Sequence, residues 1–279
     1  NLVGGVDNNI KSIAKFKEKY KCECFNNVGE AMLILRPDIV VIATPTKKHL
    51  ENLREILNYG IPKMIICEKP LSYQFNEAQE IINLCKKNEV KIFINYFRRV
   101  LPGNLEILSL LNSNKIKTPF RGVFTYSKGL FNGCSHFINL MQLLFGNVQS
   151  LKIINKNEKK FDPEPDFQLD FKEGNIIFIS NKNDSVFINN AELIMHNGKL
   201  DFENSGEKIL WKPFINDKRY KGYKILGKSS KVFENDFDRI QYYVAEQIHN
   251  AIVNKKTSLC NGVEALNTQK VMEQIREKL

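Results

Sequence analysis

Two short polar segments directly follow apolar segments of strand length, and their residue types could bind a ligand. Thr44-Pro45-Thr46 follows Asp38–Ala43, and Glu68-Lys69-Pro70 follows Lys63–Cys67. In an open α/β sheet, ligands bind beyond the carboxyl ends of the strands, so both segments are placed to line a site. A Glu-Lys pair is common on solvated surfaces, but one that ends a buried strand and precedes proline favours a role in a site.

Asp7 follows a third apolar segment, Leu2–Val6, and has two interpretations. In a dinucleotide-binding fold, an acid at this point accepts hydrogen bonds from both adenosine ribose hydroxyls, and its charge repels a 2′-phosphate. An aspartate is equally an ordinary residue of a strand–helix turn, with Asn8 or Asn9 as the helix cap. The residue by itself favours the second interpretation.

His136 is a third candidate for chemistry. It falls in the first turn of a predicted helix, Ser135–Phe145, which Ser135 or Asn132 could cap. A single histidine at the start of a helix is usually a surface or packing residue. The three other histidines have the same ordinary interpretation.

The elements that must position these residues are predicted by the spacing of the apolar side chains. In the N-terminal third, strands alternate with helices across short loops, which predicts a doubly wound parallel α/β sheet. Continuous apolar runs are typical of parallel strands that are covered on both faces. The predicted strands are Leu2–Val6, Cys24-Phe25, Asp38–Ala43, Lys63–Cys67 and Lys91–Ile94, and the predicted helices are Asn9–Tyr20, Val28–Leu35, the segment between Thr46 and Gly60, and Phe75–Lys87.

The rest of the chain predicts an α+β domain with a mostly antiparallel, open sheet. His196–Lys199 is typical of a two-residue hairpin turn, because Asn-Gly tolerates positive φ at both positions. The predicted helices are Leu105–Asn112, Ser135–Phe145, Asp236–Asn254 and Val263–Glu277, and the predicted strands are Gly122–Tyr126, Ser150–Ile154, Phe167–Phe171, Asn175–Ser180, Ser185–Asn189, Ala191–Met195, Leu200–Asn204 and Lys208–Lys212.

The phosphate-binding pattern G-x-G-x-x-G is absent, and Gly4-Gly5 has no third glycine after it. We therefore expect Leu2–Val6 to be the second strand of the sheet. The first strand, the glycine-rich loop and the first helix are expected to precede residue 1, because a sheet without its central strand would expose unpaired backbone groups.

The composition is that of a globular chain. Of 279 residues, 43% are hydrophobic and 26% are charged, which excludes a disordered or fibrous protein. The longest apolar runs have strand length, and the sequence opens without a signal-peptide pattern. The six cysteines are scattered, which indicates reduced thiols in a cytoplasmic protein. No metal site is expected, because Cys22 and Cys24 lack a second pair of ligands.

The net charge of +10 has three explanations. Abundant Asn, Lys and Ile favour a compositional bias, and an anionic small molecule is the second explanation. Nucleic acid is a distant third, because no aromatic–basic motif or helix-turn-helix signal is present, and no membrane partner is expected. The absence of G-x-S-x-G and Walker-type motifs argues against a hydrolase or a kinase.

Together these motifs resemble the Gfo/Idh/MocA family, the relatives of glucose-fructose oxidoreductase and inositol dehydrogenase. The resemblance spans nearly the whole chain, and its most specific part is the E-K-P motif after a buried strand. The matching segments are Asp7, Asp38–His49, Glu68–Pro70, Asn95–Arg99, the helix with His136, Glu192–Leu200 and Gly262–Leu266.

The resemblance implies an NAD(P)-dependent oxidoreductase that acts on sugars, nucleotide sugars or cyclitols. It implies a Rossmann-type dinucleotide-binding domain in residues 1–97, lacking its first βα unit, and an α+β domain in residues 98–279 for substrate binding and oligomerisation. The boundary is expected near Tyr96–Leu101. A homodimer or homotetramer through the C-terminal sheet is expected.

The resemblance also implies roles for single residues. Lys69 is implied to be the active-site lysine. In the usual family pattern D-x-x-x-H, His136 occupies the histidine position and Asn132 the aspartate position, and Asn139 replaces a further aspartate. The expected catalytic residues are Lys69, His136 and Asn132, the expected cofactor contacts are Asp7, Thr44, Pro45, His49, Glu68 and Lys69, and the expected substrate contacts are Arg98, Arg99, Tyr126 and Asn139.

These residue types suit the implied reaction. Oxidising a secondary alcohol needs a base for the hydroxyl proton while hydride leaves to the nicotinamide, and histidine suits that role near neutral pH. Since Asn132 cannot accept a proton as aspartate does, the proton transfer falls to His136, while Lys69 stabilises the developing alkoxide. The missing aspartate leaves an alternative, a weak or silent relative that binds dinucleotide or sugar as a sensor. Asp7 favours NAD, with NADP possible.

Overall fold

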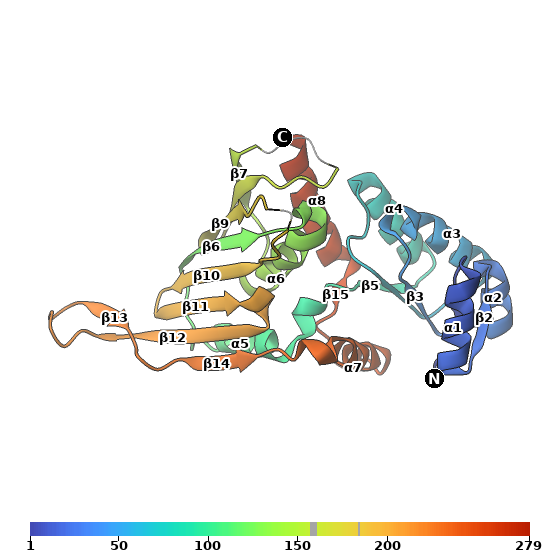
Figure 1. Ribbon diagram of the computed structural model, residues 1–279, viewed down its shortest axis with the longest axis horizontal. Helices are drawn as coiled ribbons and strands as arrows, with labels where there is room; N and C mark the ends of the chain where they lie inside the picture. The colour runs from blue at the N-terminus through green and yellow to red at the C-terminus, as the bar shows by residue number, and fades with distance from the viewer. Residues whose placement is uncertain (157–160, 184) are drawn as a thin grey trace. The chain divides into compact units, whose positions relative to one another are not determined.

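The computed structural model describes residues 1–156, 161–183 and 185–279, and it divides into two compact units (Figure 1). The first unit comprises Asn1–Asn95 with Cys260–Gln269, and the second comprises Tyr96–Leu259 with Lys270–Leu279. The sequence prediction placed residues 260–269 with the second unit. They count with the first because β15 (Cys260–Asn261) pairs antiparallel with β5 (Lys91–Ile94).

The first unit carries the predicted parallel sheet. Its strands β3, β4 and β5 run parallel in the order β15-β5-β4-β3, while β1 and β2 form a separate parallel pair. The strands are β1 (Gly4–Val6), β2 (Glu23–Phe25), β3 (Ile39–Ile42) and β4 (Met64–Cys67), and the helices are α1 (Ile10–Tyr20), α2 (Val28–Leu35), α3 (His49–Tyr59) and α4 (Phe75–Lys87).

Local sequence explains these elements. All four residues of β4 are buried, as expected for a parallel strand that is covered on both faces. The side chain of Asn9 caps α1 by accepting a hydrogen bond from the backbone N–H of Lys11 at 2.9 Å, and Asn27 caps α2 through Glu30 N–H at 2.8 Å. Burial therefore accounts for β4, and side-chain caps account for the starts of α1 and α2.

The second unit is built on a nine-stranded sheet in the order β13-β12-β11-β10-β6-β9-β8-β7, with β14 also paired to β12. Among the described residues of this sheet, only β6 and β9 pair in parallel, so the sheet is mostly antiparallel, as predicted. The strands are β6 (Phe120–Tyr126), β7 (Ser150–Asn155), β8 (Asp166–Phe171), β9 (Gly174–Ser180), β10 (Asn190–Met195), β11 (Gly198–Glu203), β12 (Lys208–Asn216), β13 (Lys224–Leu226) and β14 (Lys231–Glu234). The helices are α5 (Pro102–Asn112), α6 (Ser135–Phe145), α7 (Ile240–Ile252) and α8 (Gly262–Glu277), which crosses between the units.

One face of this sheet packs against helix α6 through aromatic side chains. Phe124 contacts Phe137 with ring centroids 4.2 Å apart, and Phe120 stacks on Phe145 at 3.9 Å. The opposite face carries exposed apolar residues, among them Val123 and Ile194. The sheet is thus covered on one side by its own unit and open on the other.

Two local predictions in this unit are corrected by the structure. Ser185–Asn189 is not a strand, because its backbone bonds to a side chain: Ile188 N–H donates to the Ser127 hydroxyl at 2.9 Å. The hairpin between β10 and β11 exists, but its turn residues are His196 and Asn197, and neither has positive φ. Gly198 is needed for another reason, since a Cβ there would lie 2.5 Å from the Lys212 carbonyl oxygen.

None of the helices in the described part of the chain has both the length and the apolar character that crossing a bilayer requires.

Thiol labelling tests the burial of the core. Cys67, Cys85, Cys134 and Cys260 are buried, and burial raises the pKa of the Cys85 thiol to about 12, whereas Cys22 and Cys24 are partly exposed. Because the thiolate is the reactive form, native protein should react with iodoacetamide at Cys22 and Cys24 alone, and unfolded protein at all six cysteines. Mass spectrometry of labelled peptides measures this, and rapid native labelling of Cys67 or Cys85 would contradict the packing.

Candidate functional site

The predicted polar loops of the first unit leave the sheet at the same edge. Strands β3 and β4 are adjacent and parallel, with Ile42 opposite Cys67. The loop that contains Thr44 and the loop that contains Glu68 therefore start side by side at the carboxyl ends of the strands, where ligands bind in such sheets. Thr44 is exposed and Glu68 is partly exposed, so both can meet a ligand.

His49 ties these two loops together. Its side chain is 1% exposed, with Nε2 3.0 Å from the Thr44 carbonyl oxygen and Nδ1 3.0 Å from the Leu71 carbonyl oxygen. A neutral imidazole donates one hydrogen bond, and only the protonated ring donates to both carbonyls at once. His49 was predicted to contact the cofactor, but both its nitrogens face main-chain carbonyls, which gives it a part in positioning the loops.

Asn95 extends the same edge to a third strand; it opens the Asn95–Arg99 motif, but no role was predicted for it. It directly follows β5, next to β4, and its Nδ2 donates to Glu68 Oε1 at 2.7 Å. A carboxylate only accepts hydrogen bonds, so the amide NH₂ must face Glu68. Asn95 Oδ1 is then left buried with no hydrogen-bond partner in the described residues. The signal in the sequence was a polar residue directly after an apolar strand, as at Thr44 and Glu68.

Asp7 follows a strand that is not part of that sheet. It follows β1, which pairs with β2 in a separate two-stranded sheet, and its side chain is exposed. Asp7 Oδ1 accepts a hydrogen bond from the Asn9 N–H at 2.8 Å, and Asn9 in turn caps α1. This contact shapes the turn into the helix, which was the ordinary interpretation of the residue.

In the second unit, His136 is held between two aromatic rings. Its ring centroid lies 5.6 Å from that of Tyr96 and 4.7 Å from that of Phe97, and the residue is 6% exposed. It is the second residue of helix α6, which directly follows a π-helical segment, Gly129–Cys134. Segments of this kind are rare and frequently lie at functional sites, which supports His136 as a candidate. The predicted cap is not formed, since Ser135 Oγ donates to the Phe131 carbonyl at 2.7 Å.

Two carboxylates that the sequence motifs missed hold this π-helical segment. Asp162 accepts the N–H groups of Phe131 at 2.8 Å and of Asn132 at 3.0 Å, and Glu164 accepts that of Gly129 at 2.7 Å. Burial raises the pKa of the Asp162 carboxyl, and hydrogen bonds from the Phe131 and Asn132 backbones oppose part of this rise. The place of Asn132 is therefore set by a loop distant in sequence.

Arg98 is buried among aromatic rings. Its guanidinium lies 4.8 Å from the centroid of Phe97 and 4.6 Å from that of Phe137, and its Nε and Nη2 donate to the Ser205 carbonyl. Burial lowers the pKa of Arg98 to about 10. Because Phe97 also contacts His136, the structure connects Arg98 to the candidate histidine through one ring.

The remaining predicted substrate contacts are also buried in the second unit. Arg99 Nε donates to the Ser258 carbonyl at 3.1 Å, and the Tyr126 hydroxyl donates to the Pro165 carbonyl at 2.6 Å. Asn139 is fully buried in α6. Substrate binding by these residues stays a prediction, while the hydrogen bonds from Arg99 and Tyr126 to these carbonyls fasten one part of the second unit to another.

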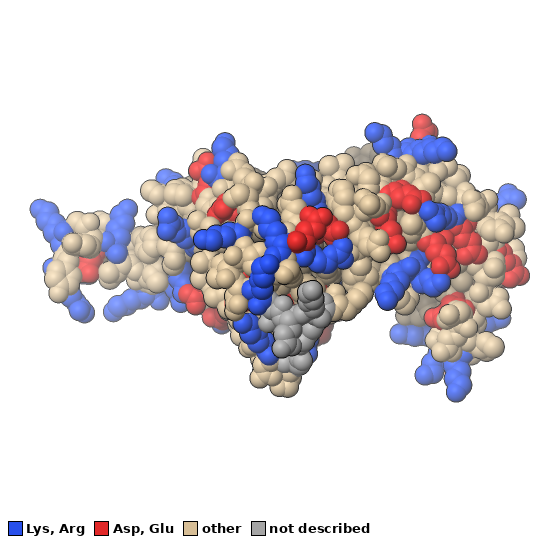
Figure 2. All heavy atoms as spheres, turned by 90° about the horizontal axis from the view of Figure 1, so that it is seen from above, with Lys and Arg blue, Asp and Glu red and all other residues tan. Residues whose placement is uncertain are grey.

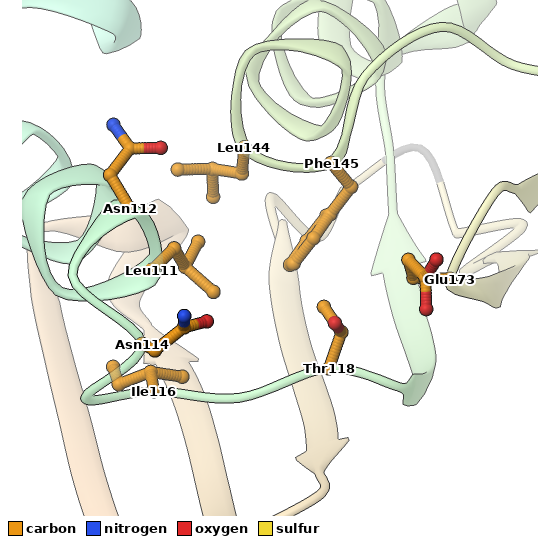
Figure 3. A pocket seen from close by; sticks show the side chains of 8 residues that line it. All are labelled: Leu111, Asn112, Asn114, Ile116, Thr118, Leu144, Phe145 and Glu173. Atoms are coloured by element: carbon orange, nitrogen blue, oxygen red, sulfur yellow. The ribbon is translucent and has the colours of Figure 1, made fainter.

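A separate hollow of about 190 Å³ lies in the second unit (Figure 3). None of the predicted site residues lines it. Its lining residues are Leu111, Asn112, Asn114, Ile116, Thr118, Leu144, Phe145 and Glu173. Throughout residues 1–156, 161–183 and 185–279, no three His, Cys, Asp or Glu side chains come together in a way that could hold a metal ion.

Replacing His49 tests its proposed positioning role. His49→Ala removes the donors that face the Thr44 and Leu71 carbonyls and leaves a cavity, so we expect the free energy of unfolding to fall by about 2–4 kcal/mol. Lys48→Ala is the matched control, because it removes only an exposed ion pair with Glu51 and should cost less than about 1 kcal/mol. Urea unfolding measures both, and equal values for the two variants would rule out the role.

Residues 1–96 match the family described as “Oxidoreductase family, NAD-binding Rossmann fold” (GFO_IDH_MocA). Over these residues, the match confirms the family resemblance that the motifs indicated. Among curated proteins, “Oxidoreductase P35” from Formosa agariphila is 38% identical over 118 residues, which are 41% of this chain and 36% of that protein. The chain thus aligns with little more than a third of this relative.

Solved structures match almost the whole chain. The structure titled as an NAD binding oxidoreductase from Klebsiella pneumoniae has a TM-score of 0.83 and 15% identity, covering 99% of this chain and 87% of that one. The aldose-aldose oxidoreductase from Caulobacter crescentus, complexed with glycerol, has a TM-score of 0.79 and 17% identity, covering 99% and 89%. At such identities the likeness shows a shared fold, a Rossmann sheet followed by a mostly antiparallel domain.

Proposed function

We propose that this chain, whose residues 1–96 match the Gfo/Idh/MocA oxidoreductases with their NAD-binding Rossmann fold, transfers hydride between a nicotinamide dinucleotide and a sugar-type substrate. The reacting group is a secondary alcohol or ketone of a sugar, nucleotide sugar or cyclitol. An aldose-aldose oxidoreductase among proteins of the same fold supports this substrate class.

The observation that carries the proposal is the edge formed by Thr44, Glu68 and Asn95. Three adjacent parallel strands end there in polar residues, and Asn95 Oδ1 is a buried acceptor without a hydrogen-bond partner in the described residues. Such an acceptor fits an N–H or O–H donor, and a nicotinamide dinucleotide offers both in its carboxamide and ribose groups. When bound, the nicotinamide ring supplies or accepts the hydride.

The proposed chemistry assigns proton transfer to His136 and charge stabilisation to Lys69. His136 accepts the hydroxyl proton in the oxidative direction and returns it in the reductive one. The ammonium of Lys69 stabilises negative charge on the reacting oxygen. The Asn132 amide forms a hydrogen bond with the substrate, as donor or as acceptor, and does not act as a base. These roles come from the family resemblance and are open to test.

The proposed cofactor is NAD. The exposed carboxylate of Asp7 would accept bonds from ribose hydroxyls and would repel a 2′-phosphate, so we expect tighter binding of NADH than of NADPH. The six cysteines support the cytoplasm as the proposed compartment, since none forms a disulfide bond among the described residues. The open face of the nine-stranded sheet, with exposed Val123 and Ile194, supports self-association of the second unit.

Substitution of the two proposed catalytic residues tests the function. Lys69→Ala and His136→Ala should each lower kcat at least about 100-fold on whichever sugar or nucleotide sugar the protein turns over, because each removes a group that acts in the transition state. His196→Ala, in the β10–β11 turn, should retain the wild-type rate. Turnover is followed by NADH absorbance.

A full wild-type rate in both variants would refute the assignment of Lys69 and His136. If the protein binds NADH but turns over no sugar, nucleotide sugar or cyclitol, the sensor function is supported over the enzyme. If it binds neither NADH nor NADPH, both functions fail.

Asn95→Ala tests the cofactor edge directly. The change removes the orphaned acceptor and frees Glu68, so the Kd for NADH should rise about tenfold, or about 1.4 kcal/mol. Asn83→Ala, at an exposed position of α4, should leave the Kd unchanged. Nicotinamide fluorescence measures both, and an unchanged Kd in Asn95→Ala would exclude this residue from the cofactor site.

A further inference from the structure

A hairpin of the second unit projects beyond the rest of its sheet. The last residue of β12 that pairs with β11 is Pro213, and residues 214–216 pair only with β13. The hairpin continues through a turn, and its stem closes again at Gly227, whose N–H donates to the Pro213 carbonyl. Figure 1 shows β13 and this turn reaching past the ends of β10 and β11. We call residues 214–228 the basic arm.

The basic arm concentrates positive charge that its own chain does not neutralise. It carries five exposed cations and one acid, and no ion pair within the described residues involves these cations. Figure 2 shows these blue side chains spread along the arm at the left of the view. The cations are Lys218, Arg219, Lys221, Lys224 and Lys228.

Neighbouring lysines of the same sheet, unlike the cations of the arm, form ion pairs. Lys208 pairs with Glu203, Lys212 lies 3.7 Å from Asp201, and Lys231 pairs with Glu106. The unmatched charge is therefore a property of the arm and not of the whole sheet. The arm also exposes apolar surface, with Tyr220 66% and Tyr223 71% exposed. An exposed element with both unmatched charge and aromatic side chains is suited to a binding role.

The opposite end of the same strand pair is acidic. Lys208, the first residue of β12, lies opposite Glu234 in β14, and the Asn235 N–H donates to the Glu207 carbonyl at 2.7 Å. Four exposed acids lie next to these paired residues and make no ion pair within the described residues, and they outnumber the two neighbouring cations, Arg239 and Lys208, of which Lys208 pairs with Glu203. We call these four acids the acidic end: Glu207, Glu234, Asp236 and Asp238.

The two charged regions are placed for self-complementary contact. They lie at opposite ends of β12, whose nine residues span about 27 Å at the usual rise of a strand. Between them β14 forms the outer edge of the sheet, with exposed Val232. In a two-fold pair, each copy presents the same surface in the opposite direction, so a region at one end meets the region at the other end twice.

We infer that the protein pairs with a second copy along this edge, the basic arm of each copy lying against the acidic end of the other. This inference rests on the proposed self-association, but it places the contact at the β14 edge rather than on the open face of the sheet, and it goes beyond the proposed oxidoreductase activity. It commits to a second copy because the same chain carries both the unmatched cations and the unmatched acids, at opposite ends of one strand. A nucleic acid or an anionic membrane would match the arm but would be repelled by the acidic end.

Charge reversal tests the inference in the purified full-length protein. The arm variant carries Lys218→Glu, Lys221→Glu and Lys224→Glu, and the acid variant carries Glu207→Lys, Glu234→Lys and Asp238→Lys. Each variant alone brings like charges together, so the dimer Kd from sedimentation velocity at low salt should rise at least about tenfold. The control variant carries Lys11→Glu, Lys15→Glu and Lys17→Glu in α1, and its dimer Kd should not change.

An equimolar mixture of the arm variant and the acid variant provides the sharpest readout. In a mixed pair, the negative arm of one copy meets the positive end of the other, and the positive arm of the second meets the negative end of the first. Heterodimers should therefore form in the mixture with a Kd close to that of the wild type. Circular dichroism and NADH binding of each variant verify that the fold and the first unit are intact.

The outcomes separate the inference from the proposed function. A dimer that neither variant weakens, or a mixture that stays monomeric, overturns the arm contact and leaves self-association standing. A wild type that is monomeric at all concentrations overturns both the contact and self-association, while NADH binding and turnover report on the oxidoreductase independently. Arm-dependent binding of a labelled oligothymidine or of phosphatidylserine vesicles by a monomeric wild type would assign the arm to those partners instead.

Discussion

The parallel register of β3, β4 and β5 is the constraint on which the candidate cofactor site depends. With Ile42 opposite Cys67 and Cys67 opposite Ile94, the three strands end at one edge, and the residues that follow are Thr44, Glu68 and Asn95 after at most one intervening residue. A one-residue slip would invert the faces of every side chain in a strand. His49 then fixes the two loops to each other by facing a carbonyl of each.

In the second unit, the candidate histidine is positioned without the help of parallel strands. His136 lies in the first turn of α6, and the π-helical turn before it has backbone N–H groups that no helical carbonyl accepts in the usual pattern. Asp162 and Glu164 accept them, and the aromatic rings of Tyr96 and Phe97 confine the imidazole. Asp162 and Glu164 are partly buried, and carboxylates removed from water are costly unless they receive hydrogen bonds, so the carboxylates and the π-helical turn stabilise each other.

Secondary structure was largely predictable where local patterns were strong. Helices α2 and α4 have the predicted bounds, because their apolar spacing and end residues are local properties. The prediction of a strand at Ser185–Asn189 was wrong because the hydroxyl of Ser127, distant in sequence, accepts a hydrogen bond from the Ile188 N–H. The short strands β13 and β14 were missed because three or four residues carry too little periodicity. The net charge of +10 was interpreted as compositional bias, whereas the structure concentrates part of it on one arm.

By itself, the sequence determined the fold class, the alternation of elements and the loops with Thr44 and Glu68, since all of these depend on neighbours along the chain. Only the tertiary structure decided which side chains join those loops into an edge: Asn95 as partner of Glu68, and His49 as a link between main-chain carbonyls. It also placed Asp162 against the backbone of Asn132. The physical reason is that a hydrogen bond between segments far apart in sequence depends on how the strands align in space, and no periodicity within either segment records that alignment.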